Sequence, residues 1–100
     1  MHATVRRYPG NAALVDALLP HEAEVTQMLR DIPGFRAYLL WRSGSGDAVS
    51  VSLYDDKRGA KASNLAAREW LAAKLPDLSV GPPEVMAGEV AITAWQTSSG

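Results

Sequence analysis

One segment restricts the possible folds of this chain more than any other: residues 35–42, with the sequence FRAYLLWR. Successive side chains of a strand point to opposite faces. Here both faces would carry apolar residues, namely Phe35, Ala37, Leu39 and Trp41 on one and Tyr38 and Leu40 on the other. A strand that is apolar on both faces needs cover on both faces. The fold must therefore supply two apolar layers around this segment.

The remaining apolar patterns predict three more strands. Residues 48–54 alternate valine and leucine with serine and tyrosine, and the short turn 43–47 joins them to the preceding strand as an antiparallel hairpin. Residues 3–8 alternate in a similar manner and end at the turn sequence PGN. A long last strand is predicted over residues 84–95, with a bend near Gly88.

Two helices separate these strands. We expect the first helix to begin with Asn11 as its N-cap and to break at Pro20, where the ring removes a backbone hydrogen bond. The second helix is rich in alanine. Asp55 or Asp56 is expected to cap it, and it should end before Pro76.

This order of elements is typical of an α+β fold, the ferredoxin-like βαββαβ arrangement with an antiparallel sheet and two helices on one face. Two helices leave the second face of the sheet uncovered, and a large apolar row in water is unfavourable for a soluble protein. We therefore predict a homodimer that forms a dimeric α+β barrel and so protects the sheet edges. Residues 1–95 are assigned to this single domain and residues 96–100 to a flexible C-terminal tail.

Composition argues against several classes of protein. Ten lysines and arginines stand against eleven aspartates and glutamates, and this balance argues against a nucleic-acid partner. The chain has no cysteine, and His21 with Glu24 offers too few ligands for a metal ion. No apolar run has the length of a membrane helix or a signal peptide. We therefore expect a cytoplasmic protein with no cofactor, no metal and no membrane partner.

Five short segments carry a family resemblance. They are DIPGF, LLWR, AREWL, LP and PPEV, at residues 31–35, 39–42, 67–71, 75–76 and 82–85. In these segments the chain resembles the antibiotic-biosynthesis-monooxygenase-like group of dimeric α+β barrels. The resemblance implies the fold and the dimer. The group includes cofactor-free oxygenases of aromatic quinols, haem-degrading oxygenases and many members with no known activity, so an enzyme of this kind would be a cofactor-independent monooxygenase.

The functional residues of these two oxygenase branches are only partly present in this chain. The haem-degrading branch has an asparagine on the first strand and a tryptophan and a histidine on the second helix. This chain has no asparagine before Asn11 and no histidine after His21, which argues against haem degradation. The quinol-oxidising branch often has asparagine and tryptophan close together on that helix. Asn64 and Trp70 are six residues apart here and, at about 100° per residue, point in different directions, so the catalytic residues stay unassigned.

The hairpin supplies a candidate ligand site. If even positions pair with even positions, Tyr38, Ser50, Ser52 and Tyr54 share a semi-polar face, whereas a one-residue slip would break up this group. The opposite face would carry Phe35, Leu39, Trp41, Val49, Val51 and Leu53. Apolar walls with a few converging polar groups are typical of small-ligand pockets. We therefore predict that a small aromatic molecule binds between the sheet and the helices, at Tyr38, Ser52, Tyr54, Asn64 and Trp70.

Two functions are compatible with such a pocket. A cofactor-independent monooxygenase would deprotonate and orient a substrate whose anion reacts with oxygen. No strong general base is evident in the sequence, which favours the alternative, a non-catalytic ligand-binding or accessory dimer. The tryptophans also have a structural interpretation, in which Trp41 and Trp70 pack in the core or the dimer and Trp95 is a dimer contact.

Overall fold

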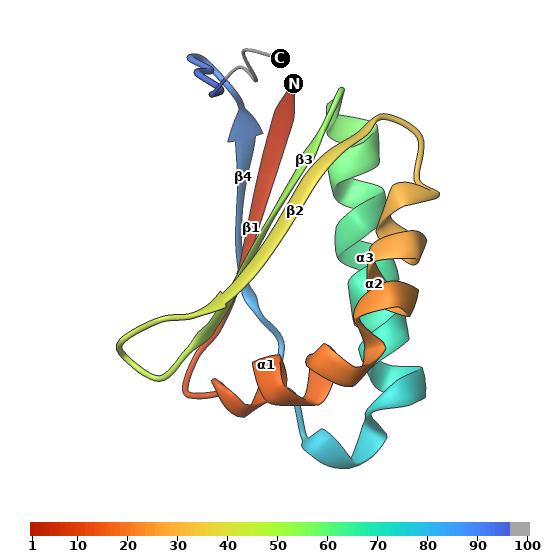
Figure 1. Cartoon of the computed structure of the whole chain (residues 1–100), viewed down its shortest axis with the longest axis vertical. Helices are drawn as coiled ribbons and strands as arrows, with labels where there is room; N and C mark the ends of the chain where they lie inside the picture. Colours follow the sequence, from red (N-terminus) through yellow and green to blue (C-terminus); the bar gives the residue numbers. More distant parts are fainter. Residues whose placement is uncertain (97–100) are drawn as a thin grey trace.

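The computed structural model describes residues 1–96, and its four strands form one antiparallel sheet in the order β2-β3-β1-β4 (Figure 1). The elements along the chain are β1 (His2–Tyr8), α1 (Ala13–Leu18), the short 3-10 helix η1 (Leu19–His21), α2 (Glu22–Arg30), β2 (Phe35–Arg42), β3 (Ala48–Tyr54), α3 (Lys57–Lys74), the 3-10 helix η2 (Pro76–Leu78) and β4 (Glu84–Glu89). Helices α2 and α3 lie side by side on one face of the sheet (Figure 1). The predicted ferredoxin-like α+β fold is confirmed.

The helical segment after β1 differs from the prediction at its start. The break at Pro20 is confirmed, because η1 contains this proline and separates α1 from α2. The predicted N-cap is wrong: Ala12 takes the cap position, and Asn11 contributes its carbonyl, which accepts from the Leu14 N–H at 3.0 Å. The Ala12 N–H donates to the Gly46 carbonyl at 3.0 Å. The chain after β1 is thus tied to the β2–β3 turn, and the helix begins later.

Helix α3 begins as predicted and packs unusually close to its neighbours. The carboxylate of Asp56 accepts a hydrogen bond from the Gly59 N–H at 3.1 Å. Gly59 has no room for a side chain, because an added Cβ would lie 2.7 Å from a ring carbon of Tyr54 and 3.0 Å from the Pro33 carbonyl oxygen. The buried Tyr54 hydroxyl donates to the Leu29 carbonyl at 2.6 Å. A glycine at this position therefore lets α3 approach the sheet.

The β2–β3 hairpin has the even register over most of its length, one of the two alternatives that the sequence leaves open, with Tyr38 opposite Ser52. Phe35 is an exception, because it was predicted on the opposite face and packs against the core instead. An irregularity between Phe35 and Ala37 shifts the register, so that Phe35 lies opposite Tyr54. The two rings meet edge to face with 5.7 Å between their centroids.

Strand β4 is shorter than predicted, since it ends at Glu89 and not at residue 95. It pairs with β1, and this pairing stops where β1 begins. The Val90 N–H still donates to the Met1 carbonyl at 2.8 Å. The ladder runs without interruption through Gly88, where the sequence predicts a bend.

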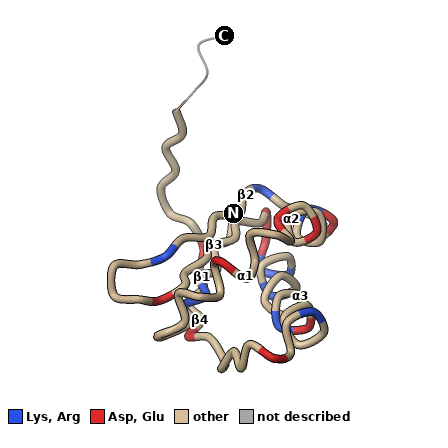
Figure 2. The backbone as a smooth tube through the Cα atoms, turned by 60° about the horizontal axis from the view of Figure 1, so that its bottom comes forward, with Lys and Arg blue, Asp and Glu red and all other residues tan. Residues whose placement is uncertain are grey.

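The chain beyond β4 leaves the body of the domain as an extended arm, residues 90–96 (Figure 2). Two large apolar residues of this arm are exposed, Ile92 at 90% and Trp95 at 63%. Of the predicted flexible tail, residues 97–100 lie outside the described part of the chain.

The two faces of the sheet differ in their cover. Under the helices lies a core of buried residues: Tyr8, Leu14, Val15, Leu18, Val25, Leu29, Ala48 and Trp70. No helix within residues 1–96 covers the opposite face, which we call the open face (Figure 1). The strand register places a row of apolar side chains on it: Val5, Leu39, Trp41, Val49, Val51, Leu53 and Met86. None of the helices described is long and apolar enough to cross a membrane.

The close approach of α3 leads to a stability prediction. Gly59→Ala should lower the free energy of unfolding by about 1–3 kcal/mol, because the added methyl group overpacks the contact with Tyr54, and this exceeds the helix-propensity gain of about 1 kcal/mol. Urea unfolding measures the difference. Gly44→Ala is the matched control, since nothing lies within 4 Å of an added Cβ there. Equal stability of the two variants would contradict the packing described.

Candidate functional site

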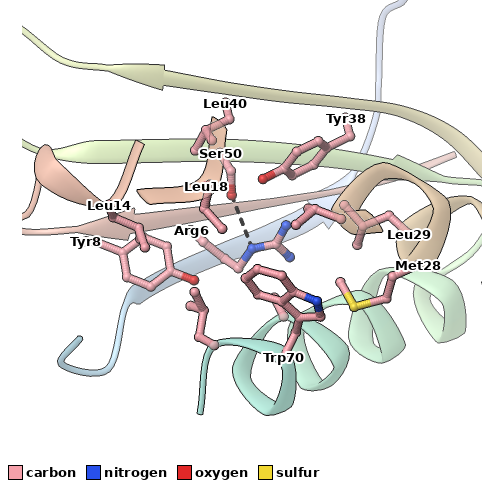
Figure 3. Close-up of a pocket in the computed structure, with 13 residues that line it drawn as sticks. Arg6, Tyr8, Leu14, Leu18, Met28, Leu29, Tyr38, Leu40, Ser50 and Trp70 are labelled. Atoms are coloured by element: carbon pink, nitrogen blue, oxygen red, sulfur yellow. Dashed lines mark hydrogen bonds between the residues drawn. The ribbon is translucent and has the colours of Figure 1, made fainter. Parts of the chain in front are cut away.

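The centre of the candidate site is Arg6, which extends from β1 toward the helices and is only 2% exposed. Its guanidinium donates to the hydroxyls of Ser50 at 3.1 Å and Ser52 at 2.8 Å, both on β3. It also donates to α3, to the Ser63 hydroxyl at 3.4 Å and the Asn64 Oδ1 at 2.8 Å. One buried cation thus connects two strands and a helix, and Figure 3 shows its hydrogen bond to Ser50.

Arg6 has no carboxylate partner. Its neighbour Arg7 pairs with Asp47 and Glu84 on the open face side. No carboxylate within residues 1–96 lies within 4.0 Å of the Arg6 guanidinium, and all four of its acceptors are neutral. Taking an ion out of water costs several kcal/mol, and an unpaired buried charge is therefore rare.

The tyrosines around Arg6 do not supply the missing negative charge. Burial raises the pKa of Tyr8 and of Tyr38, although the positive charge of Arg6 acts in the opposite direction. Burial also raises the pKa of Tyr54 to about 12. All three phenols are consequently neutral at neutral pH, and the site carries a net positive charge.

Two cavities meet at Arg6. The inner cavity lies under the helices and measures about 30 Å³. Its polar residues are Arg6, Tyr8, Tyr38 and Ser50, and Trp70 also lines it (Figure 3). A space of this size holds about one water molecule. The inner cavity is therefore part of the packed core and too small for an organic ligand.

The outer cavity is large enough for a ligand. Its volume of about 660 Å³ falls within the range of about 300–1,000 Å³ typical of ligand sites. It lies between β1, β4, one side of α3 and the segment 76–83, and most of its wall is apolar: Leu65, Leu71, Ala72, Leu75, Pro76, Val80, Pro82, Pro83 and Val85. Its polar side chains are Arg6, Tyr8, Asn64, Arg68 and Ser79.

Arg6 fixes the orientation of the Asn64 amide. An arginine can only donate hydrogen bonds, so the amide oxygen must face it. The same oxygen accepts from the Thr4 hydroxyl at 3.1 Å. The amide nitrogen therefore faces away from this pair, on a residue that lines the outer cavity. The amide nitrogen of Asn64 is thus left as a hydrogen-bond donor on a residue of the cavity wall.

The predicted ligand residues are distributed over the core and both cavities. Tyr38 and Trp70 line the inner cavity, and Asn64 lines the outer one. Ser52 is fully buried, and its hydroxyl accepts from the guanidinium. Tyr54 lines neither cavity, and its hydroxyl is engaged by a backbone carbonyl. The structure thus gathers Ser52 and Asn64 around Arg6 and assigns Tyr54 to packing.

Sequence reasoning overlooks Arg6, because an arginine next to a second arginine on a short strand ordinarily faces solvent. The available signal is alternation: Thr4, Arg6 and Tyr8 share one face of β1, and a tyrosine at the end of that row is expected to be buried. Arg68 is missed for a related reason, since it lies on an exposed turn of α3 and its role depends on the segment that folds back opposite to it.

No group of three or more histidine, aspartate and glutamate side chains within residues 1–96 is arranged to hold a metal ion. The outer cavity presents amide, hydroxyl and guanidinium groups to a ligand. Such groups bind and orient organic oxygens, and they stabilise negative charge that is present or develops there.

Comparison with known proteins supports the fold. No protein-family model matches the chain, and no curated protein is significantly similar in sequence. Among solved structures, the protein NE2512 of unknown function from Nitrosomonas europaea has 20% sequence identity and a TM-score of 0.69, over 97% of this chain and 95% of that one. A monooxygenase from the gene ActVA-Orf6 of Streptomyces coelicolor, solved with the ligand nanaomycin D, has 18% identity and a TM-score of 0.66, over 96% and 92% of the two chains.

A third structure is a mutant of SnoaB, a cofactor-independent oxygenase from Streptomyces nogalater, with 21% identity and a TM-score of 0.50, over 99% of this chain and 97% of that one. Other structures of this fold are described as antibiotic biosynthesis monooxygenases. At such identities the likeness shows the fold. The chain is therefore an α+β domain with the fold of the antibiotic-biosynthesis-monooxygenase-like proteins, and the predicted resemblance is confirmed in this respect.

The network around Arg6 predicts a large effect for a small substitution. Ser52→Ala removes a buried hydroxyl that accepts from the guanidinium at 2.8 Å, and the free energy of unfolding should fall by about 1.5–3 kcal/mol. Thermal and urea unfolding measure it. Thr26→Ala, which removes an exposed hydroxyl from α2, should change stability by less than about 0.5 kcal/mol. A Ser52 variant as stable as this control would argue against a charged, buried Arg6.

Proposed function

We propose that the protein is a homodimer that binds a small aromatic molecule in the outer cavity and oxidises it as a cofactor-independent monooxygenase. One observation carries the proposal: a ligand-sized apolar cavity of about 660 Å³ contains Asn64, an amide whose orientation is fixed by buried neighbours. The fold, which the chain shares with structures described as monooxygenases, supports the same chemistry.

The homodimer is supported by the open face. Leu39 is 61% exposed, Trp41 is 43% exposed and Met86 is 73% exposed, although all three belong to strands. Contiguous apolar surfaces of this kind mark interfaces in soluble proteins. A second copy packed face to face would cover the open face, and the exposed Trp95 on the arm would lie within reach of that copy.

The proposed oxidation requires few catalytic groups from the protein, because the substrate itself supplies the electrons. An electron-rich hydroxylated ring donates electrons to oxygen, one oxygen atom enters the ring as a carbonyl, and the other leaves as water. The protein binds the ring between apolar walls, keeps water out and stabilises the anion from which the electrons come. In this proposal Asn64 donates to the substrate oxygen, Tyr8 contributes a second hydroxyl at the cavity wall, and Arg6 supplies the positive charge behind them.

The competing function is that of a non-catalytic ligand carrier or accessory dimer. It is favoured by the composition of the outer cavity, which is lined by no histidine and no carboxylate among the described residues. A general base of the ordinary kind is therefore missing from the cavity wall. The two functions share the same ligand site and differ in whether oxygen is consumed.

The dimer has a direct test. Light scattering at micromolar concentration should give twice the mass of the chain, and Leu39→Lys should weaken association by about 100-fold or more, because it buries an unpaired ammonium in the interface. Leu65→Lys is the control: Leu65 is similarly exposed, at 49%, but lies on α3, away from the open face. A well-folded monomer of the unmodified chain would refute the dimer.

The reaction is tested by oxygen uptake with a panel of reduced naphthoquinols and anthrones. The unmodified chain should accelerate uptake, and Asn64→Ala should lower the rate by about 10²-fold, the typical effect of removing one donor to a developing oxyanion. Gln27→Ala is the matched control, because it removes an amide from the surface of α2 that bonds to Asp31. Bound ligand in native mass spectra without oxygen uptake would establish the carrier instead.

A further inference from the structure

We propose that the outer cavity selects ligands in their anionic form, as an aromatic ring that carries an ionised oxygen, either a carboxylate or an enolate. The inference depends on the proposed function only in placing a ligand in this cavity. It does not require that the ligand react with oxygen.

The first argument is the charge of the cavity wall. Two arginines line it, Arg6 and Arg68, and no aspartate or glutamate among the described residues does so. The whole chain has a net charge of −1, so this local excess of positive charge is not a consequence of composition. An anion would compensate both guanidinium groups in a space with mostly apolar walls, where the attraction is weakly screened.

The second argument is the contrast with the other arginines of the sheet. Each of them has a carboxylate partner: Arg7 pairs with Asp47 and Glu84, Arg36 with Asp55, and Arg42 with Asp16. Those three arginines lie near water, where a partner matters least. Arg6 is buried, where a countercharge matters most, and it has only neutral acceptors. The chain thus provides no carboxylate for the buried Arg6, and a bound anion would supply the missing negative charge.

The third argument is geometric. Four of the five N–H donors of the Arg6 guanidinium are used within the chain, so Arg6 would act on the ligand mainly through Asn64, whose oxygen it binds and whose nitrogen it leaves as a donor. Chains of hydrogen bonds of this kind polarise one another, and a donor behind a cation is strengthened. Arg68 follows Asn64 by one helical turn on the same side of α3, so the two donors can bind one ionised group.

The outer cavity also has apolar walls that can contact the aromatic ring of the ligand. Leu71 continues the same side of α3, Leu75 follows directly after the helix, and Val80 and Val85 line the cavity from the segment 76–83 and from β4. A flat ring between these walls would direct its ionised oxygen toward β1. The cavity thus has a positively charged end and an apolar end.

The test uses two matched pairs of ligands, naphthoate with naphthamide, and a hydroxynaphthoquinone with its methyl ether. Affinities are measured calorimetrically under nitrogen with the full chain. The ionised member of at least one pair should bind about tenfold more tightly than its neutral partner. Preference within the first pair identifies a carboxylate ligand, and preference within the second identifies an enolate. Equal affinities in both pairs would overturn the inference.

Two variants test the source of the preference. Asn64→Asp places a carboxylate beside the Arg6 guanidinium, where the amide oxygen now lies 2.8 Å away. Affinity for the ionised ligands should fall at least about tenfold, while the neutral ligands should lose less than about threefold. Thermal unfolding confirms that the variant is folded. Retained binding of the anion by folded Asn64→Asp would contradict the role of the uncompensated charge.

The second variant addresses the mouth of the cavity and does not disturb the core. Arg68→Ala should weaken binding of the ionised ligands about threefold, in line with the small value of exposed charge pairs. Arg58→Ala, on the same helix but outside the cavity, should have no effect. An equal loss of affinity in Arg68→Ala and Arg58→Ala would mean that only the net charge of the protein matters, and it would refute the proposed site. These anaerobic measurements are independent of oxygen uptake, so either proposal can fail while the other stands.

Discussion

The burial of one guanidinium organises the helix side of this domain. Arg6 stands in the middle of the sheet, and its hydrogen bonds require hydroxyl groups on β3 and on α3 where aliphatic residues would otherwise pack. The serines that alternate with valine along β3 are explained by this requirement. The same charge sets the direction of the Asn64 amide and raises the electrostatic potential of both cavities. Core and candidate site are therefore built from one network.

Much of the fold could be predicted, because its elements are specified locally. Strand alternation, the proline that divides the first helical segment and the aspartate cap of α3 each depend on a few neighbouring residues. The predictions from the sequence fail where contacts with distant segments determine the local structure. The start of α1 is set by a contact with the β2–β3 turn, Phe35 changes face because of one irregular residue, and β4 ends opposite His2, the first residue of β1. None of these contacts has a signature within the segment it affects.

The candidate site could be predicted only in part, for a related reason. The even register, one of the two that the sequence leaves open, places Tyr38, Ser50 and Ser52 under the helices, and Asn64, which the sequence also offers as a ligand residue, lines the outer cavity. Tyr54 is equally polar in sequence, yet its hydroxyl is consumed by a carbonyl of α2. Arg6 escapes prediction because burial of a cation is unfavourable unless many partners converge. Those partners lie more than forty residues away in the chain.

The segment 76–83 forms one wall of the outer cavity, and Leu78 and Val80 pack from it against the edge of the core. It contains three prolines, which cannot donate backbone hydrogen bonds, and it connects α3 to β4 without joining the sheet. The residues proposed to recognise an ionised oxygen belong to β1 and α3, which are regular elements of the sheet and of the helix layer. Lengthening or trimming this connection would change the size of the molecule admitted and leave its charge preference unaltered. Changes in this one loop would therefore be enough to alter substrate size among related proteins, without repacking of the core.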